Sequence, residues 1–528
     1  MNPKCPKCGK QMVRGPKTAA GKLRWRCRGP LPEAKVCYQT TDPSKPVRSA
    51  SGATKKPQKA VIFRRTVGGK TTIIVTAGQN ATPAHAGFVK TLEEHANAVN
   101  AADILVIPYR YKNPTSRFGN KEENDEWWDS ALTPYLCNQR KRLNANLILM
   151  GDIKIQATAG KPLAMMDSLS HGESGIFGHP KLQLRTVPVP SNQFPKILTT
   201  TGTATAENYT DTKLGKVGEF HHTLGAAIVE LHGKTFHLRQ INASKASGEY
   251  DDLDRHYSTS SVTGAARAKA LVLGDWHKDY ALPSVERATF GPGGMVSTLK
   301  PEVIAWHDLS DSYAVNPHHK GNWVIANAKA ASGRLDARAE LERACGYVLE
   351  NTPADTLSVI VASNHHDFLS RWMMATDPRD LTGANFDLWV ETAAAMKASA
   401  KSTMKGTEYT DAFVYWARKF FAGHPNVRVL ERGESFVVAG VELGLHFDKG
   451  PNGARGSLQN LRRIGTKIMG GHGHGPGIDE GGTQVGTATG QLEYAVGGPS
   501  GWLNTHGVIY GTGKRSLLNI IGNEWRRT

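Results

Sequence analysis

Long apolar runs and cysteines are both scarce in this chain of 528 residues. No apolar stretch approaches the roughly 18 residues that span a bilayer, and the N-terminus is polar and basic where a secretory signal would be apolar. Six cysteines are too few for a disulfide scaffold of this length. These absences argue against membrane and secreted proteins, so we expect a protein of the reducing cytoplasm without a membrane partner.

Acidic residues are scarce at the N-terminal end. Residues 1–60 contain fifteen Lys and Arg against Glu33 and Asp42, which places about +13 of the formal charge of +18 in this segment. A cationic segment attracts polyanions, and nucleic acid is the commonest polyanion in a cytoplasm. A solvated basic tail without a partner is the alternative.

Four of the six cysteines lie in the first 37 residues. Cys5 and Cys8 have zinc-knuckle spacing, and Cys27 and Cys37 complete four thiolates, so a structural zinc is predicted. Loose cysteines in a tail are the alternative. The arrangement resembles zinc ribbons of transposases and other DNA-handling proteins. Basic and aromatic residues within it can contact phosphates and stack on a base, namely Arg24, Trp25, Arg26 and Arg28.

The sequence predicts four parts: a basic zinc ribbon at 1–40, a Pro/Ser/Lys-rich linker at 41–60, and two larger regions at 61–262 and 263–528. Within 61–262, an α/β or α+β domain of unassigned role is indicated by expected strands at 71–76, 102–109 and 236–241 and a helix at 88–99.

Beyond residue 263, five apolar strands run directly into Asp, Asn or His. They are expected at 269–277, 302–308, 357–366, 441–446 and 466–474. Helical spacing at 333–351 predicts a βαβ crossover with parallel pairing, and further helices are expected at 386–402 and 410–423. Because ligands gather at the carboxyl ends of strands in α/β sheets, the five strand ends predict one site.

The polar residues at these strand ends have the chemistry of a site for two divalent cations. Such a site needs a bridging carboxylate, which Asp308 can supply, and further His, Asp or Asn ligands. Each motif alone also fits an ordinary turn or a glycine loop, and only their combination favours a metal site. The predicted ligands are Asp275, His277, Asp308, Asn364, His446, His472 and His474, with His365 beside them. We expect the pairs His318-His319 and His221-His222 at the surface or in an outer layer.

In order, the motifs resemble those of calcineurin-like metallophosphoesterases. The matching segments are Gly274–His277, His307–Asp311, Ser363–His365, Leu445-His446 and Gly471–His474, with departures at His307, where the family usually has glycine, and at the extra His366. The resemblance covers 263–528 and implies a β-sandwich flanked by helices. It also implies one metal held by Asp275, His277 and His474 and a second held by Asn364, His446 and His472. Asp308 would lie between the metals, and His365 would act as acid or base.

The resemblance implies a two-metal-dependent phosphodiesterase in which a metal-bound hydroxide attacks the phosphate in line. Manganese is expected first, with iron, zinc or magnesium as alternatives. The basic zinc ribbon favours a polymeric substrate, so a hydrolase acting as a DNA nuclease is predicted. The run 490–514 resembles phage DNA-degrading proteins of the first-step-transfer type, which implies the host cytoplasm.

Other functions stay open. A phosphatase or phosphodiesterase acting on small esters or nucleotides would need the same metals, whereas a DNA-binding regulatory protein would use them structurally. A homo-oligomer is also open.

Overall fold

The computed structural model describes residues 12–15, 24–27, 70–111, 127–191, 193–404 and 406–526. Contacts within the chain divide it into Met1–Phe63 and Arg64–Thr528. In the first unit, β1 (Met12–Gly15) pairs antiparallel with β2 (Arg24–Cys27). Of the residues assigned to the zinc ribbon, Arg24, Trp25, Arg26 and Cys27 lie on β2, and Cys5, Cys8, Arg28 and Cys37 lie outside the described residues. The zinc site therefore stays a prediction.

A four-stranded sheet begins the second unit. Its order is β11 (Thr235–Asn242), β10 (Gly225–His232), β3 (Lys70–Gln79) and β4 (Asp103–Tyr109). The parallel pair β3–β4 is connected through α2 (Ala86–Ala98), whose Phe88 and Leu92 pack on Ile74 of β3. The expected strand–helix–strand unit is confirmed, and so is the strand predicted at 236–241.

A ten-stranded sheet joins regions that are far apart in the sequence. In spatial order it contains β21 (Val437–Val438), β22 (Val441–Glu442), β23 (Lys467–Gly470), β25 (Gly482–Gln484), β24 (Gly477–Asp479), β8 (Gln183–Val187), β9 (Lys196–Thr200), β7 (Ser174–Phe177), β6 (Leu147–Met150) and β5 (Arg140–Asn144). The connection between the two halves is the antiparallel pair β24–β8. Segments on both sides of residue 262 thus share one sheet and one compact unit.

A six-stranded sheet contains the first three strands whose ends were predicted to carry ligands. Its order is β20 (Val427–Val429), β17 (Leu357–Ile360), β16 (Val303–Trp306), β15 (Ala270–Val272), β26 (Thr505–Ile509) and β27 (Arg515–Asn519). The first four strands are parallel, as the predicted crossover requires. That crossover contains α7 (Ala337–Asn351), which begins later than expected because Asp336 caps it, its side chain accepting from the Ala339 N–H at 3.0 Å.

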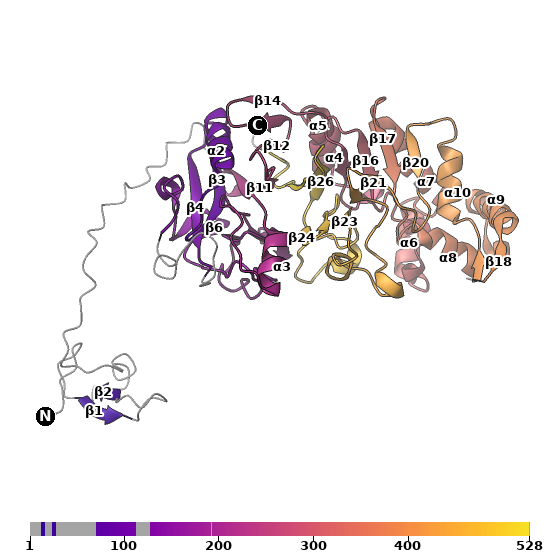
Figure 1. Cartoon of the computed structure of the whole chain (residues 1–528). Helices are drawn as coiled ribbons and strands as arrows, with labels where there is room; N and C mark the ends of the chain where they lie inside the picture. Colours follow the sequence, from indigo (N-terminus) through magenta and orange to yellow (C-terminus); the bar gives the residue numbers. More distant parts are fainter. Residues whose placement is uncertain are drawn as a thin grey trace. The chain divides into compact units, whose positions relative to one another are not determined.

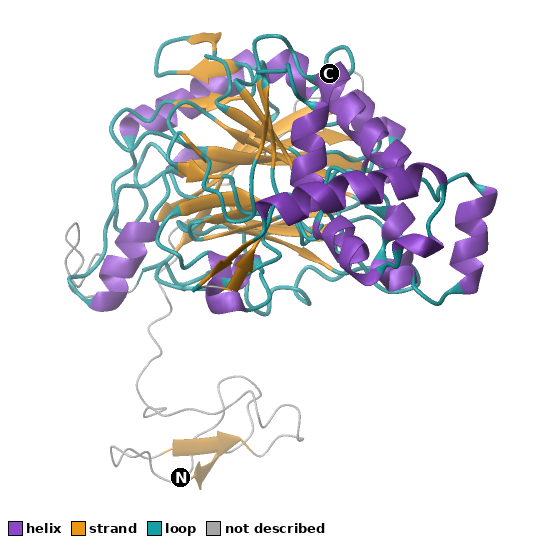
Figure 2. Ribbon diagram, turned by 90° about the vertical axis from the view of Figure 1, so that its right-hand side faces the viewer, coloured by secondary structure: helices purple, strands orange, loops and turns teal. Residues whose placement is uncertain are grey.

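The six- and ten-stranded sheets pack through a common core. Val272, Ala305 and Val359 of the former belong to one buried cluster with Val441 and Met469 of the latter. A second buried cluster joins the six-stranded sheet to helices that include α4 (Pro283–Phe290), α5 (Met295–Leu299), α7, α8 (Asp367–Ala375) and α10 (Ala412–Phe420). Figure 2 shows the strands in layers with many of the helices gathered on one side. The general α/β class is confirmed.

The remaining elements lie around these layers. They are α3 (Lys213–His221), β12 (Tyr250–Asp252), β13 (Arg255–Tyr257), β14 (Val262–Gly264), α6 (Trp323–Ala331), α9 (Gly383–Ser399), β18 (Lys401–Thr403), β19 (Gly406–Glu408) and α11 (Leu458–Leu461). Helices α7 to α10 gather at the end of this unit away from α2 (Figure 1). The helix expected at 386–402 ends at Ser399, and residues 401–403 pair with β19 instead. No helix among the described residues is long and apolar enough to cross a bilayer.

Candidate metal centre

The predicted ligands meet where strands of the two packed sheets end. Asp275 and His277 follow β15, Asp308 follows β16, and Asn364 and His365 follow β17. From the ten-stranded sheet come His446, after β22, and both His472 and His474, after β23. Parallel strands deliver their carboxyl ends to one edge, which is why residues so distant in sequence converge.

Asp275 is fully buried and held by the loop after β23. Its carboxylate accepts the backbone N–H of His472 at 2.8 Å and lies 3.1 Å from Nε2 of His474. A Cβ on Gly471 would lie only 2.0 Å from Oδ1 of Asp275. The glycine before His472 therefore makes room for this carboxylate.

Asp308 occupies the centre of the cluster. Its Oδ2 lies 3.1 Å from Nε2 of His446 and 3.6 Å from Nε2 of His277. Two groups have ligand atoms that all lie within 4.8 Å of one another, namely His277, Asp308 and His365, and Asp275, Asp308 and His446. Asp308 belongs to both groups, as a carboxylate between two ions would.

Asn364 and His472 complete the cluster. The Asn364 Oδ1 lies 3.1 Å from Nδ1 of His472, and the His472 ring lies 5.3 Å, centroid to centroid, from that of His446. The structure thus brings together all seven predicted ligands and His365. Their role as ligands stays a prediction.

Asp311 is a site residue that the sequence reasoning left without a role. Its Oδ1 lies 3.0 Å from Nδ1 of His277 and 3.2 Å from Nδ1 of His365. A carboxylate at Nδ1 orients an imidazole so that Nε2 faces the centre. The second Asp of the Asp-x-x-Asp spacing at 308–311 was the available signal.

The two histidines that depart from the family motifs are buried beside the site. Nδ1 of His307 lies 3.3 Å from Nδ1 of His446, and burial lowers the pKa of His307 to about 4. The ring of His366 stacks on Phe413 at 3.6 Å, and burial holds its pKa well below the usual value. Both therefore pack as neutral rings.

Charge is balanced between the carboxylates and the imidazoles. Burial alone would raise the pKa of Asp308, but the charges of His446 and His365 outweigh it and hold that pKa well below its usual value. Burial would lower the pKa of His365, but Asp308 and Asp311 outweigh it and raise that pKa to about 10. The carboxylates are thus kept ionised, as ligands must be.

The backbone at the site adopts an uncommon conformation. Four predicted ligands have left-handed φ angles: His277 at 42°, Asp308 at 43°, His472 at 77° and His474 at 53°. Residues other than glycine pay a steric cost there, and such positions concentrate at functional sites. The surrounding sheets hold these residues in place.

The donor set fits divalent metal ions. Among the buried side-chain atoms that make no hydrogen bond are Nε2 of His277, Oδ1 of Asp308 and Nδ1 of His474. Buried polar atoms are rarely left unsatisfied, and imidazole with carboxylate suits manganese, iron or zinc without separating them. Groups able to hold metal ions are therefore present.

The cluster opens into a cavity of about 870 Å³. Asp308, Asn364, His365, His472 and His474 form one part of its wall, and the rest includes Tyr313, His318, His319, Arg455 and Tyr494. The pair His318-His319 thus faces this cavity, whereas His222 lies buried with Nδ1 2.8 Å from the hydroxyl of Tyr209. The volume of the cavity lies in the range of pockets that bind small molecules.

Fold and cluster together define a class: an α/β protein whose strands end at buried histidines and aspartates able to hold metal ions. The chain belongs to the family of Protein A1 of Escherichia phage T5. The two are 31% identical over 468 residues, which cover 85% of this chain and 81% of that protein. No family model matches the chain, and no solved structure matches it.

Proposed function

We propose that this protein is a two-metal-dependent phosphodiesterase of the calcineurin-like type that acts as a DNA nuclease. The observation that carries the proposal is the position of Asp308, which belongs to both groups able to hold a metal ion. A carboxylate shared by two ions a few Å apart is the arrangement that two-metal phosphoester hydrolysis requires.

We assign the remaining ligands to two ions as the resemblance to calcineurin-like metallophosphoesterases implies. Asp275, His277 and His474 would hold one ion, and Asn364, His446 and His472 would hold the other, with manganese as the first candidate. When bound, the two ions would lower the pKa of a water molecule and neutralise phosphate oxygens.

The chain's own residues would position the substrate and move a proton. Asp311 contacts Nδ1 of His365, so Nε2 is free to donate a proton to the leaving oxygen. Arg455 is exposed and lines the cavity, where its guanidinium would bind a phosphate.

A polymeric substrate is supported by charge. The segment 1–60 carries about +13, and a separate cationic arm adds affinity for a long polyanion but little for a small ester. The relative is a phage protein, and we infer that this chain acts on DNA in the host cytoplasm.

The test is digestion of linear and closed-circular DNA with Mn²⁺, Mg²⁺ or EDTA. We expect cleavage by the wild type that depends on Mn²⁺ and falls roughly 100-fold or more in His365→Ala, the usual loss for a proton-transferring group. His424→Ala, which truncates an exposed histidine outside the cavity, is the matched control and should cleave normally.

Other outcomes would point elsewhere. Hydrolysis of bis-p-nitrophenyl phosphate with both DNAs left intact would replace the nuclease by an enzyme for small esters. If a folded, metal-loaded protein cleaved neither substrate, a DNA-binding role would replace the enzyme.

A further inference from the structure

A second hollow of about 570 Å³ lies away from the metal cavity. It is formed by α3, the segment after α11, the start of β23 and the turn between β26 and β27. We call it the basic groove and define it by Phe220, Arg463, Lys467, Lys514 and Arg515, which line it. None of these residues lines the metal cavity.

Part of the positive charge around the groove is already neutralised. Lys181 lies 3.3 Å from Glu480, and Arg462 lies 3.4 Å from the same carboxylate. Both cations also contact the buried Asp479. Lys245, at the groove's other side, pairs with Glu207 at 2.5 Å. Among the ion pairs of the described residues, these carboxylates contact Lys181, Arg462 and Lys245 and none of the cations that define the groove.

The remaining cations have no acidic partner. Within the part of the chain that the structure describes, Arg463, Lys467 and Lys514 form no ion pair. Among the described residues, the guanidinium of Arg515 donates only to the backbone carbonyls of Ile468 and Gly481, at 2.9 and 2.8 Å. Four cations without an ion pair on one hollow surface, where Glu480 is the one acidic lining residue among those described, indicate a site for an anion with several negative groups.

The titration of the inner two cations agrees with this geometry. Burial, followed by the like charges of Lys467, Lys245 and Arg515, lowers the pKa of Lys514. Burial lowers the pKa of Arg515 to about 10. A negatively charged ligand would relieve both effects.

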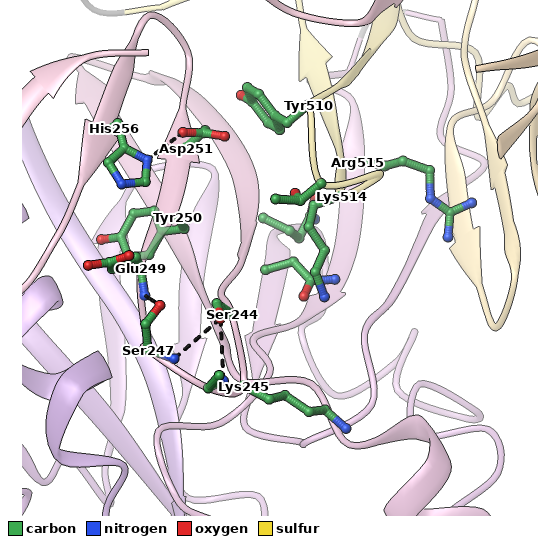
Figure 3. Close-up of a pocket in the computed structure, with 14 residues that line it drawn as sticks. Ser244, Lys245, Ser247, Glu249, Tyr250, Asp251, His256, Tyr510, Lys514 and Arg515 are labelled. Atoms are coloured by element: carbon green, nitrogen blue, oxygen red, sulfur yellow. Dashed lines mark hydrogen bonds and ion pairs between the residues drawn. The ribbon is translucent and has the colours of Figure 1, made fainter. Parts of the chain in front are cut away.

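A neighbouring cavity of about 560 Å³ extends the groove. It shares Asn242, Lys245, Lys514 and Arg515 with the groove. In Figure 3, Lys514 and Arg515 come from the β26–β27 hairpin and Lys245 from the loop after β11, while Asp251 and His256 contact each other apart from them. The two hollows therefore adjoin at Lys245, Lys514 and Arg515, and the far wall of the second carries the carboxylates of Glu249 and Asp251.

An aromatic ring, that of Phe220, also lines the basic groove. Phe220, near the end of α3, is 81% exposed. Among the ring contacts of the described residues, it makes only one, an edge contact with His221 whose ring centroid lies 5.0 Å away. A cationic groove beside an exposed ring is the combination with which proteins bind unpaired nucleic acid: phosphates contact the cations and a base stacks on the ring.

We propose that the basic groove binds a single strand of nucleic acid, with phosphates on Arg463, Lys467 and Lys514 and one base on Phe220. The identity of this polyanion rests on the proposed function, whereas the groove itself does not. Lys467 begins β23, and His472 follows its end, five residues on. At about 3.3 Å per residue of extended chain, Lys467 and His472 are at most roughly 17 Å apart, a span within reach of one strand of nucleic acid.

The test compares binding of labelled single-stranded and duplex oligonucleotides by fluorescence anisotropy, with full-length protein in EDTA over a range of salt concentrations. The variant Lys467→Ala/Lys514→Ala should make the slope of log K against log salt shallower by about 1.4 for the single strand, at about 0.7 per phosphate contact. The matched control Lys234→Ala/Lys397→Ala removes two exposed lysines elsewhere and should keep the wild-type slope. Equal slopes for the two double variants would contradict the proposal that the basic groove binds the phosphates of the strand.

The variant Phe220→Ala tests whether the groove prefers single-stranded over duplex nucleic acid. It should weaken single-strand binding about tenfold and leave duplex binding unchanged, because paired bases offer no free face. Phe386→Ala, on α9, is the control for loss of a partly exposed ring. An equal loss for the duplex, or no loss for the single strand, would overturn the single-strand assignment. Since no hydrolysis occurs in EDTA, a protein without activity would count against the proposed function alone.

Discussion

At the scale of the residue, Gly471 is a position where one added methyl group should disturb the candidate metal site. A methyl group there would lie 2.0 Å from Oδ1 of Asp275, so the carboxylate must move. We expect Gly471→Ala to lower metal content and DNA cleavage together, as measured by elemental analysis and digestion.

The control for this substitution is Gly346→Ala in α7, where an added Cβ meets nothing within 4 Å. This variant should keep its metal. Because alanine has a higher helix propensity than glycine, its free energy of unfolding should rise by up to about 1 kcal/mol. Normal metal content in Gly471→Ala would show that metal binding does not need the space that Gly471 leaves for the Asp275 carboxylate.

Substitution of Asp311 tests whether metal binding and activity depend on the orientation of His277 and His365. Asp311→Asn keeps the shape but removes the charge that faces Nδ1 of both His277 and His365. Loss of such a contact typically costs about 10- to 100-fold in metal affinity or activity.

Metal titration and kcat measured separately would show which of the two falls. Asp377→Asn, an acidic residue paired with exposed Arg379, should change neither. Wild-type values for both in Asp311→Asn would show that the two histidines need no such partner.

At the scale of the element, α7 supports the loop that follows β16. Glu340 of α7 is buried, and its carboxylate accepts the N–H groups of Tyr313 and Ala314 at 2.8 and 2.9 Å and the hydroxyl of Ser310 at 3.1 Å. Asp311 lies within this loop. The helix thereby connects sheet packing to the geometry of the candidate site.

Glu340→Ala should leave those N–H groups unsatisfied and cost about 1–3 kcal/mol each in free energy of unfolding where they stay buried. We also expect weaker metal binding, because Asp311 would lose its fixed position. Urea denaturation and metal titration, compared with the solvent-facing Glu342→Ala, would measure both. A variant that is less stable but binds metal normally would separate the helix from the site.

At the scale of the whole molecule, buried neutral histidines predict a dependence of stability on pH. Burial lowers the pKa of His95, His179 and His222 to about 4. Since the unfolded chain takes up protons near pH 6.5 and the folded chain does not, the free energy of unfolding should fall as the pH drops from about 6.5 to about 4, by up to about 3 kcal/mol for each site.

Urea denaturation in EDTA at pH 7.5 and pH 5 measures this effect. His222→Gln removes one titrating group and should have a smaller difference between the two pH values than the wild type. An unchanged difference would mean that His222 is protonated in the folded protein.

Much of the candidate site could be predicted from the sequence, because its signals are local. An apolar strand that ends in Asp-x-His or in Gly-His-x-His needs only neighbouring residues to be recognised, and the order of five such strand ends predicted that seven ligands and His365 would meet. The helix of the β16–α7–β17 crossover was likewise predicted from the spacing of its apolar residues.

Other features depend on contacts between distant segments, and only the tertiary structure decided them. The antiparallel pair β24–β8 makes one sheet from both sides of residue 262, although neither strand identifies its partner by its own pattern. The basic groove combines Phe220, Lys467 and Lys514 from three separate elements. Local periodicity determines which residues form a strand or helix and which face is apolar. Strand partners and shared surfaces depend on hydrogen bonding and packing over long sequence separations, which no local pattern contains.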